Sequence, residues 1–167
     1  MTDIQIRRAI ATDVEAIAHF NQALALESEH RVLDPPTVQA GVAQLLARPE
    51  LGFYLVATAS DQPVGCLLIT TEWSDWRNGL FWWIQSVYVQ PAYRRQGIFR
   101  RLYQTVNELA QAQGEVCGLR LYVEQDNRAA QNTYRNLGMA PTAYQVYETL
   151  DLESLPTPSP IQEYDKT

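Results

Sequence analysis

The chain of 167 residues contains few of the residue types that build cross-linked or metal-bound proteins. It has two cysteines and two histidines, too few for a metal cluster. Cys66 and Cys117 stand alone in apolar, strand-like stretches, which predicts buried, reduced thiols rather than a disulfide framework. We therefore expect a protein that holds no metal and is stabilised by its core alone.

Long apolar runs and an excess of basic charge are missing as well. No apolar stretch approaches the roughly 20 residues needed to cross a bilayer. The first residues lack the basic-then-apolar order of a secretory signal, so a cytoplasmic location is expected. The net charge is −6, and an acidic surface repels nucleic-acid backbones. We therefore expect neither a membrane nor a nucleic acid as partner.

The composition changes only near the end of the chain. Its length is typical of one domain, and no internal repeat is present. From Glu153 onward the sequence is rich in Pro, Ser and Thr and has little to bury. The sequence predicts a folded domain over residues 1–152 and a surface tail over residues 153–167.

Apolar periodicity in the remaining sequence predicts a mixed α/β fold. Thr12 with Glu15 has the spacing of a capping box, and Asp34 before two prolines is typical of a helix start. A turn at residues 60–63 favours an antiparallel hairpin. The elements expected in chain order are strand 4–8, helices 12–27 and 34–46, strands 53–59, 65–71 and 81–89, helix 98–113, strand 116–123, helix 127–138 and strand 141–150.

The most informative stretch is residues 87–99, in which a β-branched strand and a proline lead into a glycine loop and an amphipathic helix. Backbone N–H groups at a helix start, with the positive end of the helix dipole, favour a bound phosphate. Gly97 allows close approach to the backbone. The arginines around it are Arg94, Arg95, Arg100 and Arg101. A small polyanion explains this local charge better than an ordinary basic loop does.

The segment Arg94-x-x-Gly97-x-Phe99 resembles the phosphate loop of the GNAT superfamily of acyl-CoA-dependent N-acyltransferases, whose pattern is Gln/Arg-x-x-Gly-x-Gly/Ala. Phe99 stands where that family usually has a small residue. The stretches 121–127 and 130–139 are similar to the second half of the same fold. The resemblance covers most of residues 4–150 and implies a mixed, mostly antiparallel central sheet with helices on both faces, in the order β-α-α-β-β-β-α-β-α-β.

The resemblance also implies how acetyl-CoA binds. The N–H groups of residues 95–100 would take the pyrophosphate, and the backbone of Val87 and Val89 would pair with pantetheine like an added strand. Asn127, which by itself indicates a helix cap, would contact the same arm. The implied cofactor-binding residues are Val87, Val89, Arg94, Arg95, Gln96, Gly97, Ile98, Phe99, Arg100 and Asn127.

Tyr134 has two interpretations. It shares a helical face with Ala130 and Leu137, which is typical of a half-buried core tyrosine. The resemblance implies instead a catalytic phenol beside the thioester, which protonates the thiolate as it leaves.

The general base is not singled out by the sequence. The stretch from Trp76-x-x-Gly79 to Trp83-Ile-Gln-Ser-Val-Tyr-Val resembles diamine acetyltransferases, which carry Glu-Asp where this chain has Gln85 and Ser86. Glutamine accepts no proton at neutral pH, so the base must be a water chain or another side chain. The candidates are Glu27, Glu29, His30, Glu72 and Glu124.

The acceptor is expected to be a small cationic amine, with a peptide as the second choice. Tryptophans precede the glycine loop, and their rings attract cations. The resemblance implies that the first helix connection and the connection between the strands 65–71 and 81–89 flank the acceptor end, and both carry carboxylates here. The candidate substrate contacts are Glu27, Glu29, Glu72 and Asp75. Solvated surface charge is their alternative interpretation.

We therefore expect an N-acetyltransferase that moves an acetyl group from acetyl-CoA to a primary amine by direct attack in a ternary complex. The alternative is a CoA-binding regulatory or interaction module with weak or lost catalysis, because the strand carboxylate is missing. A P-loop nucleotide hydrolase is disfavoured, because no Gly-Lys-Ser/Thr follows the loop. Whether the chain forms a homodimer is left open.

Overall fold

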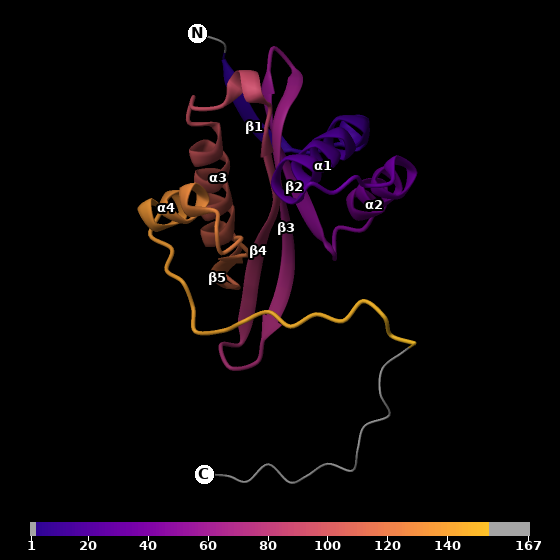
Figure 1. Ribbon diagram of the computed structural model, residues 1–167. Helices are drawn as coiled ribbons and strands as arrows, with labels where there is room; N and C mark the ends of the chain where they lie inside the picture. Colours follow the sequence, from indigo (N-terminus) through magenta and orange to yellow (C-terminus); the bar gives the residue numbers. More distant parts are fainter. Residues whose placement is uncertain (1–2, 154–167) are drawn as a thin grey trace, which may run out of the picture. The chain divides into compact units, whose positions relative to one another are not determined.

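The computed structural model describes residues 3–153, which belong to two compact units, residues 1–124 and 125–167 (Figure 1). Each unit is described by itself below. Nearly all of the tail predicted for residues 153–167 lies outside the described residues. The single domain over residues 1–152 therefore stays a prediction.

The first unit is built on one five-stranded sheet. Its strands are β1 (Ile4–Arg8), β2 (Gly52–Ala59), β3 (Gln62–Ser74), β4 (Gly79–Val89) and β5 (Val116–Leu121). They lie side by side in chain order, antiparallel except for β4 and β5, which are parallel. The predicted mixed, mostly antiparallel sheet is confirmed, and the hairpin at residues 60–63 joins β2 to β3.

Helices cover both faces of this sheet, as predicted. Figure 1 shows α1 (Val14–Glu29) and α2 (Pro35–Ala47) on one side and α3 (Ile98–Gln113) on the other. Asp34 caps α2 as expected, because its carboxylate accepts the N–H of Thr37 at 3.0 Å. The start of α2 is therefore where its cap signal places it.

The two faces have separate apolar cores. Under α1 and α2, the rings of Tyr54 and Tyr88 pack with Phe20 among aliphatic side chains. On alternate strand positions, Leu67 and Trp82 are fully buried and so face α3. Burial of these large side chains stabilises the sheet between two helical layers.

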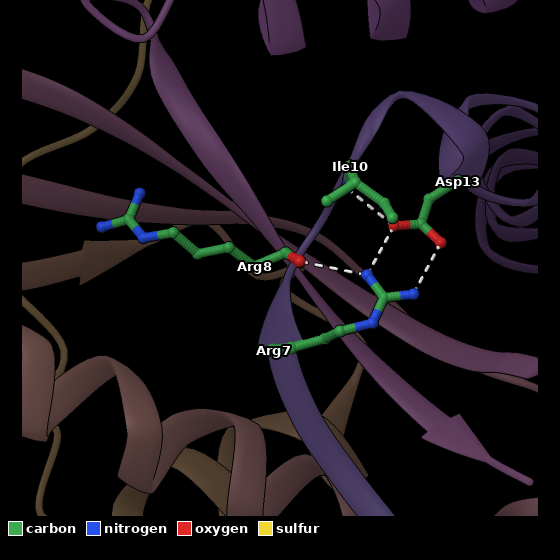
Figure 2. Close-up of polar contacts among 4 residues, drawn as sticks. All are labelled: Arg7, Arg8, Ile10 and Asp13. Atoms are coloured by element: carbon green, nitrogen blue, oxygen red, sulfur yellow. Dashed lines mark hydrogen bonds and ion pairs between the residues drawn. The ribbon is translucent and has the colours of Figure 1, made fainter. Parts of the chain in front are cut away.

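The start of α1 differs from its prediction. No side-chain cap bonds the helix, and its first turn is a 3-10 turn, Ala11–Asp13. The buried Asp13 carboxylate accepts the Ile10 N–H at 2.7 Å and two hydrogen bonds from Arg7 at 2.7 and 3.0 Å (Figure 2). The Thr12–Glu15 capping box is therefore wrong, because Asp13 occupies this place with an arginine from β1.

Ionisation of Asp13 is favoured by these contacts. Burial alone would raise the pKa of Asp13, but the hydrogen bonds from Arg7 and from the Ile10 N–H outweigh it. The pKa of Asp13 is therefore lowered, and the pKa of Arg7 is raised, chiefly by the same hydrogen bond. Figure 2 shows that the Arg7 guanidinium also donates to the Arg8 carbonyl, at 3.1 Å, so this pair joins β1 to the start of α1.

The described part of the second unit has one helix, α4 (Arg128–Asn136). The strand expected at 141–150 is wrong, since these residues form no strand. Side chains such as Tyr144, Val146 and Leu150 are 71–80% exposed there. Their alternation favours a strand, but a strand also needs hydrogen bonds from a neighbour, and no described residue supplies a ladder.

Both cysteines are free. Cys66 is fully buried in β3, and burial raises the pKa of its thiol to about 12. Cys117 is exposed, so its predicted burial is wrong: it lies on β5, an edge strand that only β4 pairs. Within residues 3–153, no helix combines the length and apolar character of a bilayer span.

Candidate functional site

The glycine loop leads directly into α3, as the sequence predicts. A 3-10 turn (Pro91–Tyr93) follows β4, and Gly97 occupies the N-cap position of α3 with a φ of +77°. No side chain caps this helix. A Cβ added at Gly97 would meet nothing within 4 Å, so that side of the loop is open. The arrangement is suited to an anion held by backbone N–H groups.

The arginines of the loop fall into two groups. The Arg94 guanidinium donates to the Val89 carbonyl at 2.8 Å and to Glu27 at 2.6 Å, so it ties the loop to β4 and α1. Arg95, Arg100 and Arg101 are exposed and make no ion pair with any described carboxylate. Positive charge around the helix start therefore comes from these three side chains.

Two further residues of the loop have internal partners. The Gln96 side-chain amide donates to the Ala92 carbonyl at 3.2 Å. Phe99, which stands where the family has a small residue, is half-buried, with its ring centroid 6.3 Å from that of Tyr103 one turn later. Ile98 is buried beneath the helix.

β4 and β5 pair over only part of their lengths. Their register runs from Leu80 with Val116 to Ile84 with Leu121. Residues 85–89 continue β4 and pair with β3, but no described strand pairs with their other edge. Val87 and Val89, the predicted pantetheine contacts, lie in this open part of β4. An extended amide-bearing chain would find unpaired backbone groups here.

A β-bulge interrupts β4 at the same place, and sequence reasoning missed it. Cys66 faces Tyr88 and Leu68 faces Gln85, so two residues of β4, 86 and 87, oppose Leu67 alone. Ser86 has a φ of +47°, in the left-handed region that L side chains seldom adopt. A serine in a β-branched run gives no local signal of such a bulge.

The predicted acceptor carboxylates do not form one cluster. Glu27 is engaged by Arg94 and also accepts the Tyr88 hydroxyl at 3.1 Å. Burial first, and then Glu27, raises the pKa of Tyr88. Glu29 makes no ion pair with a described residue. Asp75 accepts the backbone N–H of Trp76 at 2.9 Å.

Glu72 belongs to an aromatic cluster that spans β3, β4 and β5. One of its oxygens accepts from Arg120 at 2.7 Å and the other accepts the indole N–H of Trp83 at 2.5 Å. Arg120 lies 3.6 Å above the Phe81 ring, and Trp83 stacks on Tyr122 with centroids 4.6 Å apart. Arg120 therefore balances the charge of Glu72, which sequence reasoning did not foresee, and it also lies over the Trp83 ring at 5.8 Å.

The second unit contains Asn127 and Tyr134. Asn127 caps α4, since its side-chain oxygen accepts the Ala130 N–H at 3.0 Å, and this confirms its structural interpretation. Burial raises the pKa of Tyr134, so its phenol is protonated at neutral pH. Among residues 3–153, no group of three or more His, Cys, Asp or Glu is arranged to hold a metal ion.

Comparison with known proteins points to one family. The model of the acetyltransferase (GNAT) family matches residues 18–139. A possible acetyltransferase from Clostridium difficile 630 is 44% identical in sequence over 87% of this chain and 96% of its own, with a TM-score of 0.83. No curated protein matches the chain.

More distant solved structures are similar in fold alone. A predicted acetyltransferase from Clostridium acetobutylicum, solved with acetyl-CoA, is 16% identical over 89% of this chain and 97% of its own, with a TM-score of 0.73. A transcriptional regulator from Bacillus halodurans C-125 is 19% identical over 88% and 99%, with a TM-score of 0.75. These comparisons give no specific support to the finer resemblance to diamine acetyltransferases.

Proposed function

Since the chain belongs to the acetyltransferase (GNAT) family, whose members are acyl-CoA-dependent N-acetyltransferases, we propose that it acetylates a small cationic primary amine. The amine attacks acetyl-CoA directly in a ternary complex. The observation that carries this proposal is the open edge of β4 directly before an uncapped helix start. The unpaired edge of β4 could pair with an extended amide arm, and the free N–H groups at the start of α3 could bind an anion. These two sites lie within about fifteen residues of each other in the chain.

The cofactor's pyrophosphate would be held by the backbone of residues 95–100, with Gly97 as the point of closest approach. The exposed side chains of Arg95 and Arg100 add charge. Arg94 serves this site as the tie between the loop, Val89 and Glu27. The pantetheine arm would pair with β4 at Val87 and Val89, with Asn127 as a further contact.

The chemistry needs two proton transfers. The amine nitrogen, once it has lost a proton to a base, forms a bond to the thioester carbon, and the carbon–sulfur bond then breaks. We propose that Tyr134, whose raised pKa keeps the phenol protonated before the reaction, gives its proton to the thiolate as the carbon–sulfur bond breaks. The base stays unassigned, and the candidates remain a water chain, Glu27, Glu29, His30, Glu72 and Glu124.

Aromatic rings and carboxylates without an ion pair support a cationic acceptor. Tyr122, stacked on Trp83 near the point where β4 and β5 part, is 56% exposed, and Trp76 is 84% exposed. Glu29 and Asp75 make no ion pair with a described residue, whereas Arg94 and Arg120 engage the other two predicted carboxylates. Two cysteines without a disulfide suit the reducing cytoplasm, where we place the reaction.

An acetyl-transfer screen tests the proposal. Acetyl-CoA is offered with cationic, neutral and anionic amines, and free CoA thiol is detected. We expect the highest kcat/KM for cationic amines, eroded by added salt. Acetyl-CoA binding without turnover of any amine would contradict catalysis and favour a CoA-responsive module.

The control for this screen is Gly97→Asp. The substitution places a side chain and a negative charge where the pyrophosphate would approach, so acetyl-CoA should no longer raise Tm. Wild-type protein at 100 Kd of ligand gains about 2.7 kcal/mol. A folded Gly97→Asp protein that still binds acetyl-CoA would contradict the cofactor site.

Tyr134→Phe tests the proton donor. Only a hydroxyl is lost, so kcat should fall about 10- to 1,000-fold while the Kd for acetyl-CoA changes little. An unchanged kcat, in a reaction limited by chemistry, would assign Tyr134 to packing alone.

A further inference from the structure

One acceptor on the open edge of β4 is already bonded by a side chain of the protein. The Gln90 N–H donates to the Val64 carbonyl of β3 at 2.9 Å, and the peptide bond that precedes this N–H is trans. In a trans peptide the carbonyl points opposite to the next N–H. The Val89 carbonyl therefore points away from β3, toward the open edge, where the Arg94 Nε–H donates to it at 2.8 Å.

The Arg94 guanidinium is held there by a carboxylate of α1. A terminal nitrogen of the guanidinium donates to one Glu27 oxygen at 2.6 Å, and the Tyr88 hydroxyl donates to the other at 3.1 Å. The guanidinium carbon also lies 5.4 Å from the centroid of the Tyr88 ring. These contacts fix Arg94 at the end of the open edge, between β4 and the helix start at Gly97.

The contacts of Arg94 are nevertheless easy to exchange. Both side chains of the Arg94–Glu27 pair are 43% exposed, so water can replace either partner and the pair contributes little to stability. A guanidinium binds phosphate in a bidentate, charge-assisted geometry, which is stronger than a single bond to a neutral carbonyl. Arg94 stands three residues before Gly97, the point of closest approach proposed for the pyrophosphate. A phosphate at the helix start therefore competes with Val89 and Glu27 for Arg94.

We propose that Arg94 closes the Val89 end of the β4 edge and is exchanged when CoA binds: an amide N–H of the pantetheine arm takes over the Val89 carbonyl, and the guanidinium moves to the phosphates. This rests on the proposed function, since it assumes that CoA lies along residues 85–89 and the start of α3. The amide arm must displace Arg94, whereas the phosphates attract it. Arg94 therefore selects for ligands that carry both parts and against ligands with the amide arm alone.

Pantetheine, which has the amide arm but no phosphate, separates the two effects. Arg94→Met frees the Val89 carbonyl and removes the phosphate partner, so pantetheine should bind about 3-fold more tightly and CoA about 10-fold more weakly. Both Kd values are measured by titration followed by NMR. The matched control is Arg95→Met, which removes the exposed arginine beside it. This control should weaken CoA binding and leave the Kd for pantetheine within about 1.5-fold of wild type.

Glu27→Gln tests the residue that holds Arg94 in place. The substitution keeps an acceptor for the Tyr88 hydroxyl but removes the charge that Arg94 pairs with. Arg94 should then exchange more readily, so pantetheine should bind about 3-fold more tightly. The control Glu29→Gln removes the same charge from the same helix, where Glu29 makes no ion pair with a described residue. Because pantetheine is uncharged, its Kd should not change in this control.

These binding measurements distinguish the exchange from the proposed activity. If the wild-type protein binds CoA but acetylates no amine, catalysis fails, and the variants still decide the exchange. If the wild-type protein binds neither ligand, the cofactor site is wrong and the exchange is overturned with it. If CoA binds but Arg94→Met weakens both ligands, only the exchange is overturned, and Arg94 is a fixed tie for the loop. Equal Kd values for pantetheine in Glu27→Gln and Glu29→Gln would overturn it as well.

Discussion

Two arginine–carboxylate pairs of the first unit have the same chemistry and different surroundings. Arg7 and Asp13 join β1 to the start of α1, and the Asp13 side chain is 4% exposed. Arg94 and Glu27 join the glycine loop to the end of α1, and both side chains are 43% exposed. The first pair also bonds a backbone N–H, whereas the second shares its arginine with the Val89 carbonyl.

The difference separates stability from function. Removing one partner of a buried pair leaves groups that water cannot satisfy, so the loss of stability is large. An exposed pair contributes about 0–1 kcal/mol, because water and salt replace it. The Arg94–Glu27 pair therefore matters for the place of the loop, and the Arg7–Asp13 pair for the fold.

The largest effect is expected for Asp13→Ala. It removes the acceptor of the Ile10 N–H and of the Arg7 guanidinium together. We expect the free energy of unfolding in urea to fall by about 2–3 kcal/mol, with the Kd for acetyl-CoA unchanged in the folded protein. If the free energy of unfolding fell by less than about 0.5 kcal/mol, the Arg7–Asp13 pair would stabilise the fold no more than an exposed pair does.

Arg94→Met should give the opposite result. The side chain keeps its aliphatic length but frees the loop from Val89 and Glu27. We expect acetyl-CoA to bind about 10-fold more weakly by calorimetry, or about 1.4 kcal/mol, with unfolding changed by less than about 1 kcal/mol. Arg7→Met is the matched control: it should lower the free energy of unfolding and leave the affinity for acetyl-CoA unchanged. Equal losses of stability in the two variants would contradict the comparison.

Acid should remove the part of the Arg7–Asp13 interaction that depends on the negative charge of the Asp13 carboxylate. Because the pKa of Asp13 is lower in the folded protein than its ordinary value, its contribution is complete above about pH 4 and is lost as the pH falls through the folded value. The difference in unfolding free energy between wild type and Asp13→Ala should therefore shrink from pH 5 to pH 2. A difference that stays constant over this range would show that the carboxylate's charge contributes nothing.

The smallest effect is expected for Thr12→Ala. The residue is exposed and no described contact caps α1 through it, so unfolding should change by less than about 0.5 kcal/mol. A working capping box would cost about 1 kcal/mol. Such a loss would restore the sequence-based assignment of this helix start.

The sequence predicted what local patterns decide. Helical periodicity and cap residues located the four α-helices of residues 3–153: Asp34 and Asn127 were recognised as caps, and Gly97 marked the start of α3. The mixed, mostly antiparallel sheet followed from the family resemblance, and the pairing confirms it. Each of these features depends on residues within about four positions of one another, or on a motif.

The misses all involve partners distant in sequence or absent from the described residues. Asp13 replaces the predicted capping box because Arg7 reaches it from another element. Ser86 gives no local sign of a left-handed bulge, since the contact to its carbonyl comes from the Cys66 thiol on another strand. Residues 141–150 have strand composition without a strand partner. Contacts between separate elements, or the lack of a partner strand, decided these cases, and the periodicity of one segment does not contain them.

The open edge of β4 also has a consequence for handling the protein. Unpaired strand edges are templates for other extended chains, and natural proteins normally cover or charge them. Here residues 85–89 lie in a β-branched and aromatic run with no charged side chain. If acetyl-CoA pairs with this edge as proposed, protein depleted of CoA ligands should associate edge to edge more readily than the CoA-bound protein.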